Sequence, residues 1–576
     1  MSLDRREFLK ILSLASSVGM GLSSEIASAE TLAKNFYDVP KFGNLHFLHF
    51  TDCHAQLNPI YFREPQYNIG IGSQLNHAPH LVGQEYLKAF KISPASRDAH
   101  AFTHLNFTSA AQSYGKVGGF AHLTTLVKQL RSSRPNALLL DGGDTWQGSA
   151  TALWTKGQDM VDAALLLGVD IMTAHWEMTL GADRVKHIVE HDFKDKVAFL
   201  AQNIQTSDFG DPVFEPYVLK EMNGVLVAII GQAFPYTPIA NPRYFTPDWT
   251  FGIQEENLQK NVTEVRNKGA KVVILLSHNG MDTDLKLASR VRGIDAILGG
   301  HTHDGIAQAI HVKNPGGVTL VTNAGSNGKF LGVLDFDYKQ GRVTDFRYQL
   351  LPVFANLITP DLAMQSLIRE VRRPYEKQLN RVLAKTDTLL YRRGNFNGTF
   401  DQLIVDGLMK VQDAPIAFSP GFRWGTTLLP GQDITMEHLM DQTAITYPQA
   451  TVSMLKGEEI KNILEDVADN LFNPDPYYQQ GGDMVRTGGL KYTIDPFAQM
   501  GKRISDMRLN GQLLDAGTVY KVAGWASVNP DLQGSSAPAV WDILTQYLTD
   551  IKVVSKLSPN IPQIKNILGN KGLSNV

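Results

Sequence analysis

The sequence predicts a layered α/β fold, and three observations lead to this prediction. The chain has 576 residues, 43% of them hydrophobic and 9% aromatic, which is enough apolar material for full cores and two large domains. Continuous apolar runs recur along the first part of the chain and suit strands buried on both faces. Helical patterns at 120–131 and 158–167 lie between such runs. The runs, each followed by polar or glycine-rich residues, are 45–50, 137–140, 197–200, 225–230, 272–276 and 296–298.

Charge and cysteine content exclude several kinds of protein. The 54 basic residues nearly balance the 57 acidic ones, and a net charge of −3 creates no field that attracts a polyanion, so we predict no nucleic-acid partner. Cys53 is the one cysteine, which rules out an intramolecular disulfide and a thiolate cluster for zinc or iron–sulfur. Any metal must be held by His, Asp, Glu or Asn, and the chain has 16 His.

Residues 1–29 have the features of an export signal. Arg5 and Arg6 precede an apolar stretch at 11–21, and small residues follow that fit a cleavage site. The arginine pair resembles a twin-arginine signal, although Asp4 stands where that pattern usually has Ser or Thr. We therefore expect a periplasmic protein exported in folded form, with an amphipathic N-terminal helix as the alternative. The apolar stretch is about 11 residues, short of the roughly 20 that span a bilayer, so we predict no membrane span.

The chain divides into two expected domains. We assign 30–355 to the first domain, with an insertion at 59–118 that interrupts the apolar rhythm, and 386–576 to the second. The segment 356–385 between them has helical spacing broken at Pro374 and is the expected linker helix. The insertion carries four histidines that we expect to be structural or solvated rather than metal ligands: His77, His80, His100 and His104.

Acidic and histidine side chains follow apolar runs of the first domain in five places. A carboxylate and an imidazole two residues apart at a strand end project to the same side and can share a cation. One such motif is weak, because a single buried His is more often a hydrogen-bonded core residue, but five in chain order form a strong joint signal. The motifs are Asp52-Cys53-His54, Gly142-Gly143-Asp144, His175-Trp176-Glu177, Ser277-His278-Asn279-Gly280 and Gly299-Gly300-His301-Thr302-His303.

Seven of these side chains predict a pair of divalent cations. Asp144 is central, and one carboxylate can bridge two cations roughly 3.5–4 Å apart. Imidazole and carboxylate ligands without thiolate suit manganese, iron or zinc. Cys53 alternates away from the metals, and we expect it to be a buried core thiol. The expected ligands are Asp52, His54, Asp144 and His303 for one cation, and Asp144, His175, His278 and His301 for the other.

These motifs resemble the calcineurin-like metallophosphoesterases and, in both halves of the chain, their 5′-nucleotidase branch. The closer resemblance is to the dimanganese thiosulfohydrolases of the sulfur-oxidation (Sox) system, from about residue 45 to near the C-terminus. It implies two Mn²⁺ ions and a four-layer α/β/β/α sandwich joined by a helical linker to a smaller α+β domain. The segments that carry it are 52–56 (DCHAQ), 59–65 (PIYFREP), 142–148 (GGDTWQG), 175–177 (HWE) and 421–425 (GFRWG).

The resemblance also implies a monomeric periplasmic enzyme that acts on the carrier protein SoxYZ. Its substrate is a cysteine S-thiosulfonate on the C-terminal arm of that carrier. A metal-bound hydroxide attacks the sulfonate sulfur, sulfate is released, and a persulfide stays on the carrier. Two alternatives stay open: a 5′-nucleotidase or 2′,3′-cyclic phosphodiesterase on the same scaffold, and a non-catalytic carrier-binding protein that keeps its metals for structure.

One departure from the nucleotidase pattern concerns proton transfer. Nucleotidases usually read Gly-Asn-His-Glu where this chain has Ala174, His175, Trp176 and Glu177. His175 can replace the Asn ligand, but Trp176 cannot transfer a proton. An alkoxide is a poor leaving group, because its conjugate acid titrates near the roughly 15.7 quoted for water, whereas a thiol titrates near about 8.5. An enzyme that expels sulfur needs no general acid here. The alternative, an inactive relic, is opposed by the retained metal ligands.

A second departure lies in the C-terminal domain. The loop 418–423 keeps Arg423 but lacks the Asn of nucleotidases, and Ala450 occupies a base-stacking position. The glycine-rich loop at 480–486 is suited to passing a thin peptide arm. Arg423 is expected to bind the anion, with a surface ion pair as the alternative. The candidate catalytic residues are Asp144, Trp176 and Arg423; the candidate substrate-binding residues are Arg423, Trp176, Asp483 and Arg486; and Trp146 and Trp176 are the expected walls.

Overall fold

The computed structural model describes residues 36–529 and 536–574. The expected export signal at 1–29 lies outside these residues. Among the helices of the described part, none is both long enough and apolar enough to cross a membrane.

Two six-stranded sheets form the centre of the first domain. In the first sheet β1 to β4 run parallel and β13 and β14 complete it in antiparallel fashion, in the order β14-β13-β1-β2-β3-β4. In the second, antiparallel strands flank a parallel centre in the order β11-β12-β10-β9-β7-β6. The strands are β1 (Leu45–Phe50), β2 (Leu138–Asp141), β3 (Ile171–Met172), β4 (Ala198–Phe199), β13 (Phe330–Lys339) and β14 (Arg342–Pro352), then β6 (Tyr217–Met222), β7 (Val225–Gln232), β9 (Val272–Ser277), β10 (Ala296–Gly299), β11 (Ile310–Asn314) and β12 (Gly317–Asn323).

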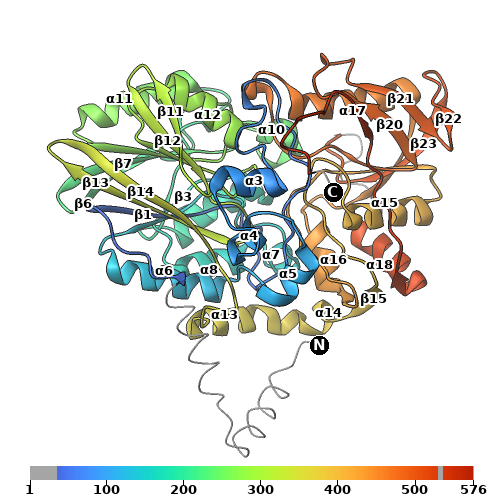
Figure 1. Ribbon diagram of the computed structural model, residues 1–576, viewed down its shortest axis with the longest axis horizontal. Helices are drawn as coiled ribbons and strands as arrows, with labels where there is room; N and C mark the ends of the chain where they lie inside the picture. Colours follow the sequence, from blue (N-terminus) through green and yellow to red (C-terminus); the bar gives the residue numbers. More distant parts are fainter. Residues whose placement is uncertain (1–35, 530–535, 575–576) are drawn as a thin grey trace, which may run out of the picture.

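The sheets pack face to face, and helices cover their outer sides. Leu45 and Phe47 of β1 join the apolar core between the sheets, whereas Leu48 and Phe50 face the helical layer. This alternation places apolar side chains on both faces of the strand, and His46 and His49 take the two remaining positions. The four-layer α/β/β/α arrangement predicted from the sequence is therefore confirmed (Figure 1). The main covering helices are α6 (Phe120–Ser133) and α8 (Gln158–Leu167) on one side, and α11 (Glu255–Asn267) and α12 (Met281–Arg290) on the other.

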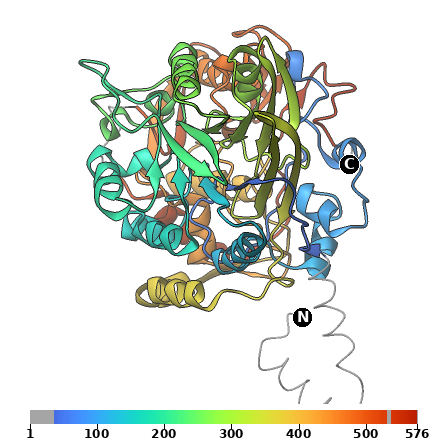
Figure 2. The same cartoon turned by 90° about the vertical axis from the view of Figure 1, so that its left-hand side faces the viewer.

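The segment expected to be an insertion packs against the second domain. It contains η1 (Gly72–Gln74), α3 (Gly83–Phe90), α4 (Arg97–Phe102) and α5 (Phe107–Tyr114). The Tyr61 carbonyl accepts a hydrogen bond from the Thr427 amide at 2.8 Å, and the Gln66 carbonyl accepts one from the Ser574 amide at 3.1 Å. The C-terminal residues accordingly lie beside these helices (Figure 2).

A short helical connection leads to an α+β domain, as predicted. It comprises α13 (Leu362–Arg372), η5 (Arg373–Tyr375) and α14 (Glu376–Leu379), and α13 ends just before Pro374. Strand β15 (Val382–Thr386) already pairs with β17 and β24 inside the expected linker, so the exact domain boundaries stay a prediction. The remaining elements are β16 (Ile416–Ser419), β17 (Asp433–Thr435), β18 (Ala450–Lys456), β19 (Arg486–Gly488), β20 (Leu490–Ile494), β21 (Ile504–Leu509), β22 (Gln512–Leu513), β23 (Val519–Trp525), β24 (Val553–Val554), β25 (Gln563–Ile564), α15 (Thr399–Gln412), α16 (Met436–Thr443), α17 (Gly457–Phe472) and α18 (Val540–Ile551).

Candidate metal centre

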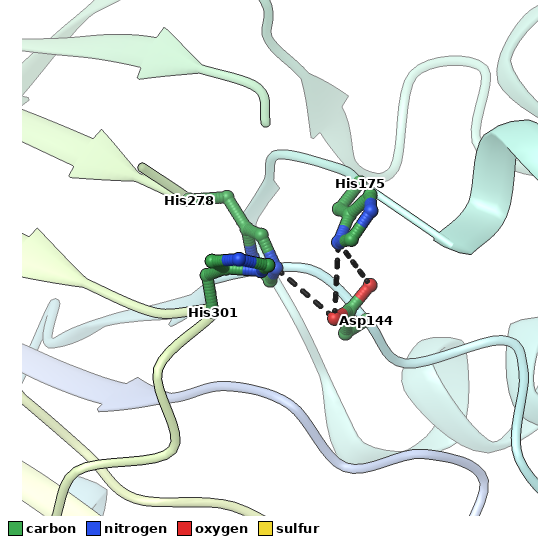
Figure 3. Close-up of side chains that lie close together, drawn as sticks. All are labelled: Asp144, His175, His278 and His301. Carbon is green, nitrogen blue, oxygen red and sulfur yellow. Dashed lines mark hydrogen bonds and ion pairs between the residues drawn. The ribbon is translucent and has the colours of Figure 1, made fainter. Parts of the chain in front are cut away.

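Seven buried side chains meet at the carboxyl ends of the central strands of both sheets. They follow β1, β2, β3, β9 and β10, which is where open α/β sheets bind ligands. Figure 3 shows four of them converging from separate loops. Within each of two clusters, the nitrogen and oxygen atoms that can act as ligands lie within 4.8 Å of one another. The clusters are Asp144, His175, His278 and His301, and Asp52, His54, Asp144 and His303. The structure thus brings together every metal ligand that the sequence predicts, in the predicted grouping.

Five of these residues have a left-handed backbone conformation. Asp52, His54, Asp144, His301 and His303 all have positive φ, between 44° and 72°. Such conformations cost about 1–3 kcal/mol each for residues other than glycine and cluster at functional sites. The loop before His301 packs so closely on the end of β1 that it needs a glycine there. A Cβ atom on Gly300 would overlap the Thr51 hydroxyl.

Asp144 lies at the centre of the two clusters. Its Oδ2 atom is 3.1 Å from Nε2 of His278, and its carboxylate is 3.2 Å from Nδ1 of His175. In the second cluster, Nε2 of His54 is 3.0 Å from Nε2 of His303, which is itself 3.2 Å from Oδ1 of Asp52. Asp144 is therefore the one side chain placed to bridge two cations.

The donor atoms fit a pair of divalent cations. Nδ1 of His301, the nitrogen that faces the cluster, is buried without a hydrogen-bond partner, which costs about 1–3 kcal/mol unless something binds it. The converging atoms are imidazole nitrogens and carboxylate oxygens without sulfur, a set that suits manganese, iron or zinc. Cys53, the one thiol, is buried in the neighbouring apolar core, as predicted.

Hydrogen bonds to carbonyl oxygens fix which nitrogen of two histidines faces the cluster. Nδ1 of His278 lies 2.6 Å from the Gly142 carbonyl, and Nε2 of His301 lies 2.9 Å from the Gln480 carbonyl. A carbonyl can only accept, so these nitrogens carry the protons. When the ring is neutral, the other nitrogen presents a lone pair to the cluster, as metal-ligating histidines do.

The charges of the cluster are strongly coupled. Burial alone would raise the pKa of Asp144, but His175 and His278 hold it well below its usual value. Burial lowers the pKa of His278, yet Asp144 and Asp52 raise it to about 10. Burial and neighbouring positive groups hold the pKa values of His301 and His303 well below normal. These last two rings are thus neutral at neutral pH, the form that binds a metal.

Glu177 organises the loops that carry two ligands. Its buried carboxylate accepts hydrogen bonds from the backbone amides of Asp144 at 3.2 Å and His175 at 3.0 Å. It also accepts from Thr145 at 2.6 Å and Trp146 at 3.2 Å. Glu177 stands within a motif of the sequence but had no predicted role, because backbone partners leave no trace in a sequence.

Replacing Glu177 by Gln is expected to weaken metal binding roughly 10–100-fold, the usual cost of losing a group that orients ligands. The amide nitrogen of Gln would face backbone donors and cannot accept from them. Chelator competition on the purified protein measures this affinity. Glu190→Gln, which changes an exposed glutamate, is the control and should bind metal as the unaltered protein does. Equal affinity of the two variants would remove Glu177 from the account.

Arg423 lies beside the metal ligands, and Arg486 lies farther back. The Arg423 guanidinium donates to the carbonyl oxygens of Gly482 and, at 3.3 Å, Thr302. Its Nε atom is 3.4 Å from Oδ1 of Asp483. Arg486 is fully buried between Asp401 and Asp483, each at 3.2 Å. Direct substrate contacts by Arg423, Asp483 and Arg486 stay predictions, and burial among protein partners favours a supporting role for Arg486.

Arg393 is a second guanidinium at the site that the sequence analysis missed. Its Nη2 atom donates to the Thr302 carbonyl at 2.9 Å, the same oxygen that Arg423 approaches. It lies 3.7 Å from Asp304, and after burial it is the largest cause of the lowered pKa of His303. Its Nε atom is buried without an acceptor. In the sequence, Arg393 stands only as part of an Arg392-Arg393 pair before Gly394. Without the fold, this pair does not indicate a residue of the site.

Aromatic rings from both domains form the wall of the site. The centroid of the Trp176 ring lies 4.9 Å from that of Trp424 and 5.2 Å from that of Phe422. Trp424 stacks on His54 with 4.8 Å between the ring centroids. The expectation that Trp146 forms a wall is wrong. Its indole packs on Phe193 and others in the core of the first domain, where it is fully buried. Trp424 takes that place.

Comparisons with known proteins agree with this architecture. The calcineurin-like phosphoesterase family matches residues 45–305, and the 5′-nucleotidase C-terminal domain matches residues 382–532. Rat 5′-nucleotidase is 29% identical over 498 residues, which is 76% of this chain and 84% of that protein. With the paired His/Asp clusters, these matches define the class of protein as a dinuclear metal hydrolase.

Comparison with solved structures identifies the family within this class. The sulfate thiohydrolase SoxB from Thermus thermophilus, solved in complex with glycerol, superposes with a TM-score of 0.87 at 34% identity and covers 92% of this chain and 98% of its own. A 5′-nucleotidase precursor from Thermus thermophilus has the same fold, with a TM-score of 0.71 at 21% identity over 91% of this chain and 99% of its own. The chain belongs to the SoxB proteins, in the 5′-nucleotidase branch of the calcineurin-like phosphoesterases.

Proposed function

We propose that the protein is a thiosulfohydrolase that releases sulfate from a cysteine S-thiosulfonate on the carrier SoxYZ. The observation that carries this proposal is Trp176, which stands beside a complete His/Asp cluster at the position where nucleotidases have a proton-donating His. Its backbone amide donates to Oδ1 of Asp144 at 2.7 Å, so its ring is held next to the reacting centre. A site of this kind suits a leaving group that departs without a proton.

The proposed reaction is a hydrolysis with no change in redox balance. The carrier group R–S–S–SO₃⁻ and water give R–S–S⁻, sulfate and two protons, and the bond that breaks joins the outer sulfane sulfur to the sulfonate sulfur. A persulfide should be a better leaving group than a thiol, whose pKa is about 8.5, so no side chain has to protonate it. The chemistry that two divalent cations supply at such a centre is activation of water and polarisation of the oxygens of an anion.

The side chains of the site would hold and shield this substrate. Arg423 and Arg393 bring two guanidinium groups close to the ligand His303, and paired guanidiniums suit an oxyanion. Trp176, Trp424 and Phe422 cover the other side and exclude water from it. We propose Mn²⁺ as the resident ion at both positions, with zinc and iron as alternatives on the same donor set. We place the enzyme in the periplasm, delivered by the twin-arginine signal at 1–29, and expect a monomer.

A phosphoesterase is the second candidate, and the nucleotidase relatives favour it. Against it, Ala450 begins β18 as a buried small residue and offers no ring to stack on a base. The two candidates are separated by assaying the purified protein, with its metals quantified, on thiosulfonate-loaded SoxYZ, AMP and 2′,3′-cyclic AMP. We expect sulfate from the carrier and little phosphate from either nucleotide. Phosphate release without sulfate release would favour the phosphoesterase. Neither product at full metal occupancy would favour a non-catalytic carrier-binding protein.

Arg423→Ala is expected to weaken sulfate binding about 10–100-fold, because a hydrogen bond to a charged group contributes about 1.5–3 kcal/mol. The metal content should not change, since Arg423 contacts carbonyl oxygens and Asp483 rather than the clusters themselves. Calorimetry with sulfate measures the first quantity and elemental analysis the second. Arg423→Lys keeps the positive charge but loses the planar guanidinium. Its sulfate affinity should fall between those of the unaltered protein and the Ala variant. Equal sulfate affinity in all three proteins would end the role of Arg423 in anion binding.

A further inference from the structure

Residues 479–483, here called the lid, lie at the edge of the candidate metal centre, against His301 and Arg423. The carbonyl oxygen of Gln480 accepts a hydrogen bond from Nε2 of His301 at 2.9 Å. The carbonyl oxygen of Gly482 accepts one from Nη2 of Arg423. Gly481, between them, packs so closely that a Cβ atom there would overlap the His301 ring. The lid therefore contacts one metal ligand and the arginine proposed to bind the anion.

The lid is anchored at its ends and weakly held between them. At one end the Gln479 amide donates to the Pro476 carbonyl at 3.1 Å, and at the other the Asp483 amide donates to the Gly421 carbonyl at 3.0 Å. Within the described part of the chain, the amides of residues 480, 481 and 482 donate to no protein acceptor. The middle of the lid is thus attached to the site by two carbonyl oxygens and the packing of Gly481, a pattern typical of segments that open locally.

We infer that the lid occupies the anion position in the resting protein and must move away before substrate binds. The Gly482 carbonyl takes the same Arg423 donor that an anionic oxygen requires, so closed lid and bound anion compete for one guanidinium. The identity of the anion rests on the proposed function, whereas the competition itself does not. The resting state is self-blocked, and this limits access of water and small anions to the centre until the lid opens.

Two neighbouring glycines provide a matched pair for testing this. Gly481 and Gly482 have nearly the same backbone conformation, with φ of +73° and +77°. An alanine at either position carries the same penalty for left-handed backbone. Only at 481 does the new Cβ meet His301, because a Cβ at 482 meets nothing within 4 Å. Gly481→Ala should therefore keep the lid from closing, and Gly482→Ala controls for backbone strain.

The first experiment measures how fast the metal-loaded protein loses its metals to excess chelator. Gly481→Ala should lose them about tenfold faster than the unaltered protein, the change in population that loss of one hydrogen bond produces. Gly482→Ala should lose them at the unaltered rate. Equal rates of metal loss for the two variants would overturn the proposal that the lid blocks the site. Circular dichroism and thermal melting establish that each variant is folded.

The second experiment uses the unaltered protein, so it does not depend on a variant that folds. Sulfate binding is followed by stopped-flow tryptophan fluorescence, because Trp176 and Trp424 lie at the centre. If the lid must open first, the observed rate levels off as the sulfate concentration rises. A rate that rises linearly to the diffusion limit would contradict the lid. Assaying sulfate release from loaded carrier on the same preparation separates the two proposals: a lid effect without sulfate release would refute the proposed substrate and leave the lid intact.

Discussion

His175→Ala is expected to leave the purified protein with about one metal ion per chain instead of two, and to reduce sulfate release at least 100-fold. His175 belongs to one cluster only, so the other cluster keeps all of its ligands. Loss of a group that merely orients a ligand costs roughly 10–100-fold in metal affinity or activity, and loss of a ligand should cost no less. Elemental analysis after dialysis against metal-free buffer gives the metal content, and ion chromatography gives the sulfate.

Two further variants make this result interpretable. Asp144→Asn alters the carboxylate shared by both clusters and should lower the occupancy of both metals. His100→Ala removes an imidazole that is also buried, 5% exposed, but packs between Phe107 and Tyr114 outside the clusters. It should keep two metals. An unchanged metal content in the His175 variant would remove the second metal position from the account.

Trp176→His is expected to raise phosphate release from AMP by at least about 100-fold, since a positioned general acid contributes typically 10²–10⁴-fold. The indole cannot donate a proton to a leaving alkoxide, and an imidazole at the same position can. Sulfate release from loaded carrier should change much less, because the persulfide departs without a proton. Colorimetric phosphate and chromatographic sulfate assays on one preparation give both rates.

The control is Trp176→Phe, which keeps an aromatic wall against Phe422 and Trp424 without any acid. Comparison with this variant separates proton transfer from the loss of the large ring. If the His variant releases no more phosphate than the Phe variant, the absence of a general acid does not explain the choice of leaving group.

The metal clusters could be predicted from the sequence because their chemistry is local. The predicted ligands follow shortly after the ends of strands, and the carboxyl ends of neighbouring parallel strands meet at one edge of a sheet. Five such motifs were therefore enough to predict the two groups of side chains, with Asp144 in both, that the structure brings together. The layered fold followed from the apolar runs, apart from strands such as β3, whose two residues are too few to form a recognisable run.

The rest of the site depends on contacts between distant segments, which the sequence does not reveal. Trp146 and Trp424 both follow site motifs, and only tertiary packing places the first in the core and the second against His54. Arg393 reaches the Thr302 carbonyl across 91 residues of chain. The contact of Gly481 with His301 likewise joins the two domains, so the glycine-rich loop was recognised without its position against His301.

The most direct test of the account is hydrolysis of thiosulfonate-loaded SoxYZ in ¹⁸O-labelled water, with two metals per chain verified beforehand. Mass spectrometry of sulfate and carrier then shows which product holds the labelled oxygen, and so which bond breaks. We expect sulfate carrying one labelled oxygen and a carrier that retains a persulfide on its cysteine. A fully metal-loaded protein that releases no sulfate, or sulfate without the label, would contradict it.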